Sequence, residues 1–217
     1  MAARRSFDQE LAELNESLIE MGNMVAQAIE NAILAFKSED LELAKTVVQG
    51  DREVDHIEKQ IESMCLSIIL RQQPVAGDLR TVTSALKMVT DMERIGDQAS
   101  DIAELILSIE GERIYDVVKN IPSMAEVAIA MVNDSITAFV ERDLDLAKAV
   151  AARDCEVDEL FDETKKELVG IIRRGEEMQD NAIEFLMIAK YLERIADHAV
   201  NICEWVNFLQ TGKQKKK

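Results

Sequence analysis

The chain has 217 residues, and its 25 Lys and Arg residues against 42 Asp and Glu residues give a formal net charge of −17. A surface this acidic repels phosphate backbones, which argues against nucleic acid as a partner. Hydrophobic residues make up 47% of the chain, enough for a sizeable core, whereas aromatic residues make up only 4% and argue against an all-β fold.

Apolar residues recur at spacings of three and four along most of the chain, which predicts amphipathic helices. The first such stripe extends from Phe7 to Ile29. Pro74 and Gly77 interrupt the pattern and predict a loop between the second and third helices. Pro122 fits the first turn of the fourth helix. We therefore predict six helices, with bounds near 6–37, 40–71, 78–109, 118–140, 143–173 and 178–210.

The chain repeats itself at long range. Residues 36–55 and 139–158 are identical at 11 of 20 positions at a constant offset of 103, and residues 86–99 match residues 186–199 at an offset of 100. A repeat of this kind indicates a duplicated structural unit. We predict an all-α fold made by tandem duplication of two three-helix bundles. The first repeat covers 1–112, and the second covers 113–217, including the basic C-terminal tail.

The third predicted helix carries a line of acidic residues. On a helical wheel, Glu93, Asp97 and Asp101 fall on one side, opposite the apolar stripe of the same segment. The sixth predicted helix repeats this arrangement, and the second and fifth helices carry acids of their own. Carboxylate oxygens suit hard cations such as Mg²⁺, Mn²⁺ or iron. Among the residues of these faces are Glu93, Asp97 and Asp101 on the third helix, Glu193, Asp197 and Asn201 on the sixth, and Asp55 and Asp158 on the second and fifth.

Two interpretations of these acidic faces stay open at this point. Most acidic helix faces are solvated surface. Like charges at i, i+4, such as Asp51 with Asp55, destabilise a helix by about 0.2–0.5 kcal/mol, which a bound cation would relieve. Both halves keep the patterns Glu-Arg-Ile-x-Asp-x-Ala and Asp-x-Glu-Val-Asp while they differ elsewhere. A ferritin-like di-iron centre is excluded, because it needs two Glu-x-x-His motifs and the second half has Glu159 in place of His56.

The cysteines and the N-terminal segment bear on the compartment. Cys65, Cys155 and Cys203 lie far apart and form no C-x-x-C pair, so we expect three buried free thiols in a reducing cytoplasm. The N-terminal residues contain no apolar signal segment. We also expect no membrane span, because no stretch approaches 18 uncharged apolar residues.

Two motifs resemble those of the PhoU family. The run LRQQPVAGDLR at 70–80, followed by DMERIGD at 91–97, carries the resemblance in the first half, and LERIADHAVNI at 192–202 carries it in the second. The resemblance extends over essentially the whole chain. It implies two similar three-helix bundles, and metal clusters on the Glu/Asp-x-x-x-Asp motifs, here Glu93 with Asp97 and Glu193 with Asp197. It also implies metal ligands at the family's next Asp/Asn position, here Asp101 and Asn201, and at the acids of the second and fifth helices, here Asp55 and Asp158. The second loop, at 173–180, departs from the Pro-Val-Ala-x-Asp-Leu-Arg pattern.

The resemblance also implies a cytoplasmic bacterial protein at the inner face of the membrane. Its expected partners are the ATPase subunit of a phosphate ABC transporter and a sensor histidine kinase, with peripheral membrane association through these partners. We expect a homodimer that restrains phosphate uptake and the phosphate-starvation response, with iron, Mn or Mg on its acidic faces and no enzymatic activity. Two alternatives remain: a carboxylate-metal-dependent enzyme acting on a phosphate compound, and a metal-free helical adaptor.

Overall fold

A computed structural model describes residues 2–109, 118–174 and 181–213, and over these residues the chain is helical. The predicted all-α class with six long helices is confirmed, although the first helix begins four residues earlier than predicted and the third two residues earlier. The predicted boundary between the repeats, at residues 112 and 113, lies outside the described residues, as do residues 214–217 of the basic tail. The helices are α1 (Ala2–Ser38), α2 (Leu41–Gln72), α3 (Ala76–Ser108), α4 (Asn120–Glu141), α5 (Leu144–Arg174) and α6 (Ala182–Thr211).

The repeated sequence builds the same helix junction twice. Asp40 caps α2, because its Oδ1 accepts hydrogen bonds from the backbone N–H groups of Glu42 and Leu43 at 3.1 and 3.0 Å. Asp143 does the same for α5, with both hydrogen bonds at 2.9 Å. Each cap satisfies N–H groups that a helix start otherwise leaves without partners. Short, well-capped connections therefore hold α1 against α2 and α4 against α5.

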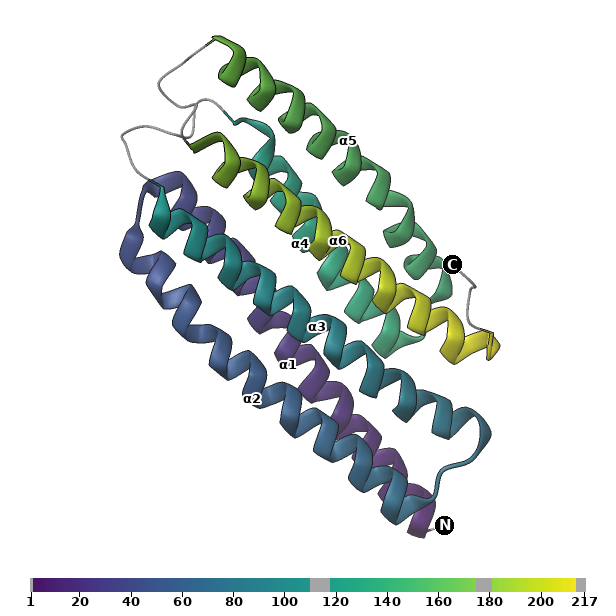
Figure 1. Cartoon of the computed structure of the whole chain (residues 1–217). Helices are drawn as coiled ribbons and strands as arrows, with labels where there is room; N and C mark the ends of the chain where they lie inside the picture. The colour runs from purple at the N-terminus through teal and green to yellow at the C-terminus, as the bar shows by residue number, and fades with distance from the viewer. Residues whose placement is uncertain (1, 110–117, 175–180, 214–217) are drawn as a thin grey trace.

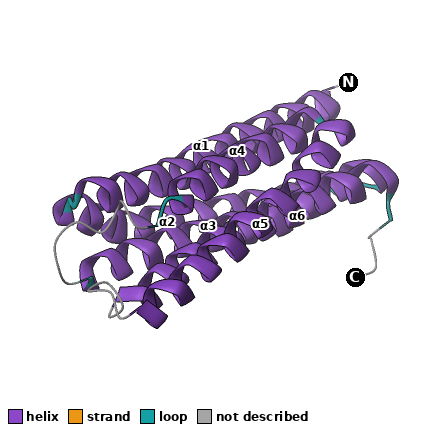
Figure 2. Cartoon of the chain, turned by 90° about the horizontal axis from the view of Figure 1, so that it is seen from above, coloured by secondary structure: helices purple, strands orange, loops and turns teal. Residues whose placement is uncertain are grey.

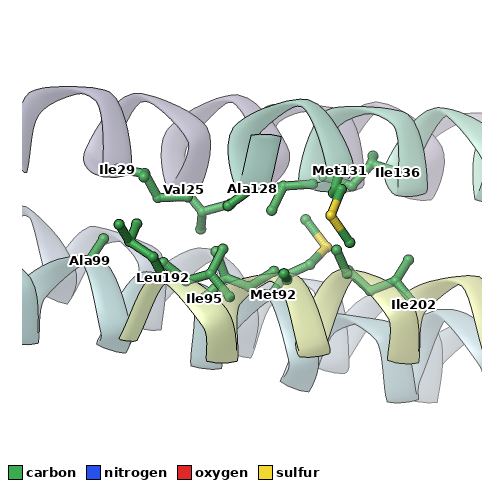
Figure 3. Packing of buried hydrophobic residues seen from close by; sticks show 14 of the residues in the cluster. Val25, Ile29, Met92, Ile95, Ala99, Ala128, Met131, Ile136, Leu192 and Ile202 are labelled. Carbon is green, nitrogen blue, oxygen red and sulfur yellow. The ribbon is translucent and has the colours of Figure 1, made fainter. Parts of the chain in front are cut away.

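The helices form two layers. Figure 1 shows α2, α3, α6 and α5 side by side in that order, and Figure 2 shows α1 and α4 together in the second layer. The two halves meet where α3 packs against α6 and where α1 packs against α4. Val25 and Ala128 from one layer face Ile95 and Leu192 from the other in Figure 3. The two three-helix units therefore share one continuous hydrophobic core.

Helix α4 is the most apolar of the six. By length and hydropathy alone it could cross a membrane. Its fully buried side chains, among them Ile121, Met131 and Val132, pack into the shared core against α1, α5 and α6. Packing in this core accounts for the hydropathy of α4.

Candidate functional site

Acidic side chains from α2 and α3 gather between these two helices. Asp51 and Asp55 come from α2, and Glu93, Asp97 and Asp101 come from α3; we call these five residues the α2–α3 acidic cluster. Burial raises the pKa of Asp51, and repulsion from Asp97 and then Asp55 raises it further. Burial, followed by the charge of Asp97, likewise raises the pKa of Glu93. The packing of α2 on α3 thus crowds together carboxylates that would each repel the others.

Arg94 supplies the nearest positive charge to this cluster. Its Nη1 donates a hydrogen bond to Oδ2 of Asp97 at 2.9 Å, and its Nε lies 3.3 Å from Oε2 of Glu93. The Glu93 side chain is only 16% exposed, and its buried Oε2 has no hydrogen bond of good geometry to any described residue. The arginine therefore neutralises the cluster only in part.

The second half places an equivalent group between α5 and α6. Asp154 and Asp158 come from α5, and Glu193 and Asp197 come from α6; we call these four residues the α5–α6 acidic cluster. Burial raises the pKa of Asp154, and repulsion from Asp158, Asp197 and Glu193 adds to the shift. Glu193 forms an ion pair with Lys190 one turn earlier, whereas Asp158 is largely exposed. The duplication thus reproduces the crowding as well as the sequence pattern.

Asn201 lies at the junction of the two halves. Its Nδ2 donates a hydrogen bond to Oδ1 of Asp91 on α3 at 3.1 Å, so this predicted ligand faces α3. Asp101 lies near the same junction, where the Tyr191 hydroxyl donates a hydrogen bond to it. Asp101 also contributes to the raised pKa of Asp51, so it borders both the junction and the α2–α3 acidic cluster.

Sequence reasoning left out several residues that the fold brings to these places. Asp51 and Asp154 are each central to a cluster, and their i, i+4 pairing with Asp55 and Asp158 was the signal that could have selected them. Asp91 was missed altogether, because nothing in its neighbourhood along the chain indicates that it accepts hydrogen bonds from α6.

The carboxylates are crowded but do not form a ready-made metal cage. Over residues 2–109, 118–174 and 181–213, no group of three or more His, Cys, Asp or Glu side chains stands in an arrangement that could hold a metal ion. A cation could bind only with side-chain rotation that draws the carboxylates together. The donor set consists of hard oxygen ligands, which fits Mg²⁺, Mn²⁺ or iron and does not fit soft metals.

Comparisons with known proteins agree with the duplicated architecture. The PhoU domain model matches twice, over residues 18–106 and 121–206. The phosphate-specific transport system accessory protein PhoU homolog of Clostridium acetobutylicum is 39% identical over 212 residues, which are 97% of this chain and 97% of that protein. Among solved structures, the phosphate transport system regulatory protein PhoU from Streptococcus pneumoniae superposes with a TM-score of 0.90 at 29% identity and covers 97% of this chain and 100% of its own. PhoU from Pseudomonas aeruginosa superposes with a TM-score of 0.87 at 33% identity, and the match covers 95% of this chain and 100% of that protein.

Proposed function

The chain belongs to the PhoU family, and we propose that it is a negative regulator of phosphate uptake and of the phosphate-starvation response. Its relatives are named accessory or regulatory proteins of phosphate transport, which supports a regulatory role and is consistent with the absence of enzymatic activity. We propose that it acts as an adaptor between the ATPase subunit of a phosphate ABC transporter and a sensor histidine kinase. In this role it works in the cytoplasm, at the inner face of the membrane, as a homodimer.

One observation carries the part of this proposal that concerns the acidic faces. Both halves crowd carboxylates between the same pair of helices, with the pKa of Asp51 and that of Asp154 raised by burial and mutual repulsion. Such crowding costs stability unless a partner of positive charge neutralises it. A bound cation supplies that charge, and so does a basic surface of a partner protein.

We propose that a cation is the physiological partner of these clusters. Glu93, Asp97 and Asp55 would hold it in the first half, and Glu193, Asp197 and Asp158 in the second. The buried Oε2 of Glu93, which lacks a well-oriented hydrogen bond, is the clearest position with spare coordinating capacity. Ordering of these side chains would couple α2 to α3 and α5 to α6, and so stiffen the faces that the partners contact. Coupling of this kind requires that a partner bind one state of the protein better than another.

Deletion of the gene in its own host tests the regulatory role. In phosphate-rich medium we expect a reporter under a phosphate-starvation promoter to switch on when the gene is deleted and to switch off again when the gene is restored. A reporter that ignores the deletion would reject the regulatory proposal.

Elemental analysis tests the metal. Protein purified without chelators or a His tag is compared with an Asp97→Asn, Asp197→Asn variant. We expect bound metal in the parent protein and its loss in the variant. A variant without metal that still restores full repression would favour the metal-free adaptor. Metal-dependent turnover of a phosphate compound that the same variant abolishes would favour the carboxylate-metal enzyme.

A further inference from the structure

A groove of about 680 Å³ lies between α1 and α2, with Gly96 of α3 at its floor. Its apolar lining includes Met24 and Ala28 of α1 and Val47 and Val54 of α2. Ile19, at one end of the groove, is 43% exposed. The groove is therefore an open apolar surface between two otherwise well-packed helices.

Gly50 on α2 keeps this groove open. A Cβ atom added at Gly50 would meet nothing within 4 Å, and the residue has no positive φ that would require glycine. A glycine inside a helix costs about 0.5–1 kcal/mol relative to alanine. Neither backbone conformation nor close packing requires glycine at position 50. What the missing side chain provides is open space beside α1.

In the second half of the chain, the position that corresponds to Gly50 is filled by a side chain. The counterpart of Gly50 is Arg153, and the counterpart of Asn31, on the facing wall, is Asp134. Nη2 of Arg153 forms a short ion pair with Oδ2 of Asp134, which joins α5 to α4 across the position that is open in the first half. Ala28 is likewise replaced by Met131, and that side chain is fully buried. The two halves thus differ at these positions, where the first half has Ala28 and Gly50 and the second has Met131 and Arg153.

The rim of the groove is acidic. Glu16 and Glu20 line it from α1, and Asp51 and Glu53 line it from α2, while no Lys or Arg is among the described residues of its lining. At an offset of 103, the position of Glu16 is occupied by Lys119 and that of Glu20 by Ser123. The acids on the α1 side of the rim are therefore particular to the first half, whereas Asp51 and Glu53 on the α2 side recur as Asp154 and Glu156.

We propose that this groove binds a basic amphipathic helix of a partner protein. Its aliphatic side chains would enter the groove between Met24 and Val54, and its Lys or Arg residues would meet the acidic rim on both sides. The wall from Glu16 to Asn31 extends for about 22 Å, which is about four turns of helix. The described residues contain no strand, so strand addition has no edge to use, whereas docking of a helix in a groove needs only an apolar floor and matched charge. The groove shares Asp51 with the α2–α3 acidic cluster, and its other lining residues lie outside that cluster.

Variants of the purified full chain that keep its net charge distinguish binding in the groove from general attraction to an acidic protein. The probe is a fluorescein-labelled peptide of about 16 residues, with Leu at spacings of three and four and Lys along both flanks. The groove-filled variant is Asn31→Asp, Gly50→Arg. It gives the first half the counterpart of the Asp134–Arg153 ion pair and leaves the net charge unchanged. The control is Asn133→Asp, Ala152→Arg, which likewise introduces one Asp and one Arg, at exposed positions of α4 and α5.

We expect the parent protein and the control to bind the peptide equally, and the groove-filled variant to bind it at least about tenfold more weakly. Peptides with Glu flanks, or with Ser in place of Leu, should also bind at least about tenfold more weakly than the Lys-flanked peptide. Equal binding by all three proteins would overturn the proposal, because it would reduce the interaction to attraction between opposite net charges. A change of oligomeric state in the groove-filled variant alone, measured by sedimentation, would assign the groove to a second copy of the chain and would also overturn it.

Discussion

Oδ1 of Asp91 on α3 lies 2.9 Å from Nδ1 of His198 on α6, and this contact joins the two halves of the duplication. The same carboxylate accepts hydrogen bonds from Asn201 at 3.1 Å and from Trp205 at 3.3 Å. The position equivalent to Asp91 is Tyr191, and its hydroxyl donates to Asp101, the counterpart of Asn201. The polar contacts between α3 and α6 therefore follow the approximate two-fold relation of the halves, with different chemistry on the two sides.

Replacement of Asp91 tests this junction. We expect Asp91→Ala to lower the free energy of unfolding by about 2 kcal/mol, because it leaves half-buried donors of α6 without their charged acceptor. Urea unfolding measures the change. The fluorescence of Trp205, the single tryptophan, should also shift, since its indole N–H loses its partner. The exposed Asp162→Ala serves as the control, and equal stability of the two variants would contradict the role of Asp91.

Replacement of Gly50 is expected to stabilise the protein, in contrast to replacement of Asp91. We expect Gly50→Ala to raise the free energy of unfolding by about 0.5–1 kcal/mol, because alanine favours the helix and its Cβ meets no neighbour. For a chain of this size the melting temperature should rise by about 2–4 °C per kcal/mol. Gly96→Ala should not show this gain, since its Cβ would lie 2.9 Å from Cγ1 of Val54. A gain of the same size at both positions would show that the Val54 contact is unimportant.

The acidic clusters make stability depend on pH. Burial, followed by repulsion from neighbouring carboxylates, raises the pKa of Asp51 and that of Asp154 above the ordinary value of 3.8. When the pH is above 3.8, the folded chain holds more protons on Asp51 and Asp154 than the unfolded chain does. The two carboxyl groups therefore lower the free energy of unfolding as the pH rises through their folded-state pKa values. They have no such effect when the pH is below 3.8, because both states are then protonated.

We accordingly expect, in the presence of a chelator, that an Asp51→Asn, Asp154→Asn variant loses less stability than the parent protein as the pH rises from 3.8 toward neutral. Asp145→Asn is the control, because Lys148 lowers the pKa of that exposed carboxyl and the linkage has the opposite sign. Urea unfolding at each pH gives the comparison. Parallel pH profiles for the parent and the double variant would contradict the crowding of these carboxylates.

The three cysteines should differ in reactivity. All three are free, and burial raises the pKa of Cys65 and of Cys203 to about 12, whereas Cys155 is exposed. The expectation that all three cysteines are buried is therefore wrong for Cys155. At pH 8 a thiol with a pKa of 12 is ionised to roughly one part in ten thousand, so it reacts very slowly. We expect Ellman's reagent to label one thiol per native chain at pH 8 and three after unfolding in denaturant. Rapid labelling of a second thiol in the native protein would show that the core opens readily.

Local features of the sequence were sufficient for the helices and for their repetition. The 3.6-residue periodicity of the apolar stripes, and caps such as Asp40 and Asp143, act within a few residues of each other and can be recognised in the chain itself. The acidic motifs could be recognised for the same reason. Their partners across helices could not, because the contacts of Asp51 with α3 and of Asp91 with α6 depend on which helices pack together.

Asn201 and Gly50 show where this limit lies. The spacing of Asn201 matched it to Asp101 and so to a metal site, but the packing of α6 on α3 turns it toward Asp91. In the sequence Gly50 is a glycine within the second predicted helix, and only its position beside α1 makes it the open side of a groove. The sequence by itself determined the helices, the duplication and the family. The tertiary structure decided which carboxylates meet, and which half stays open, because burial and mutual repulsion arise only between helices brought together by the shared core.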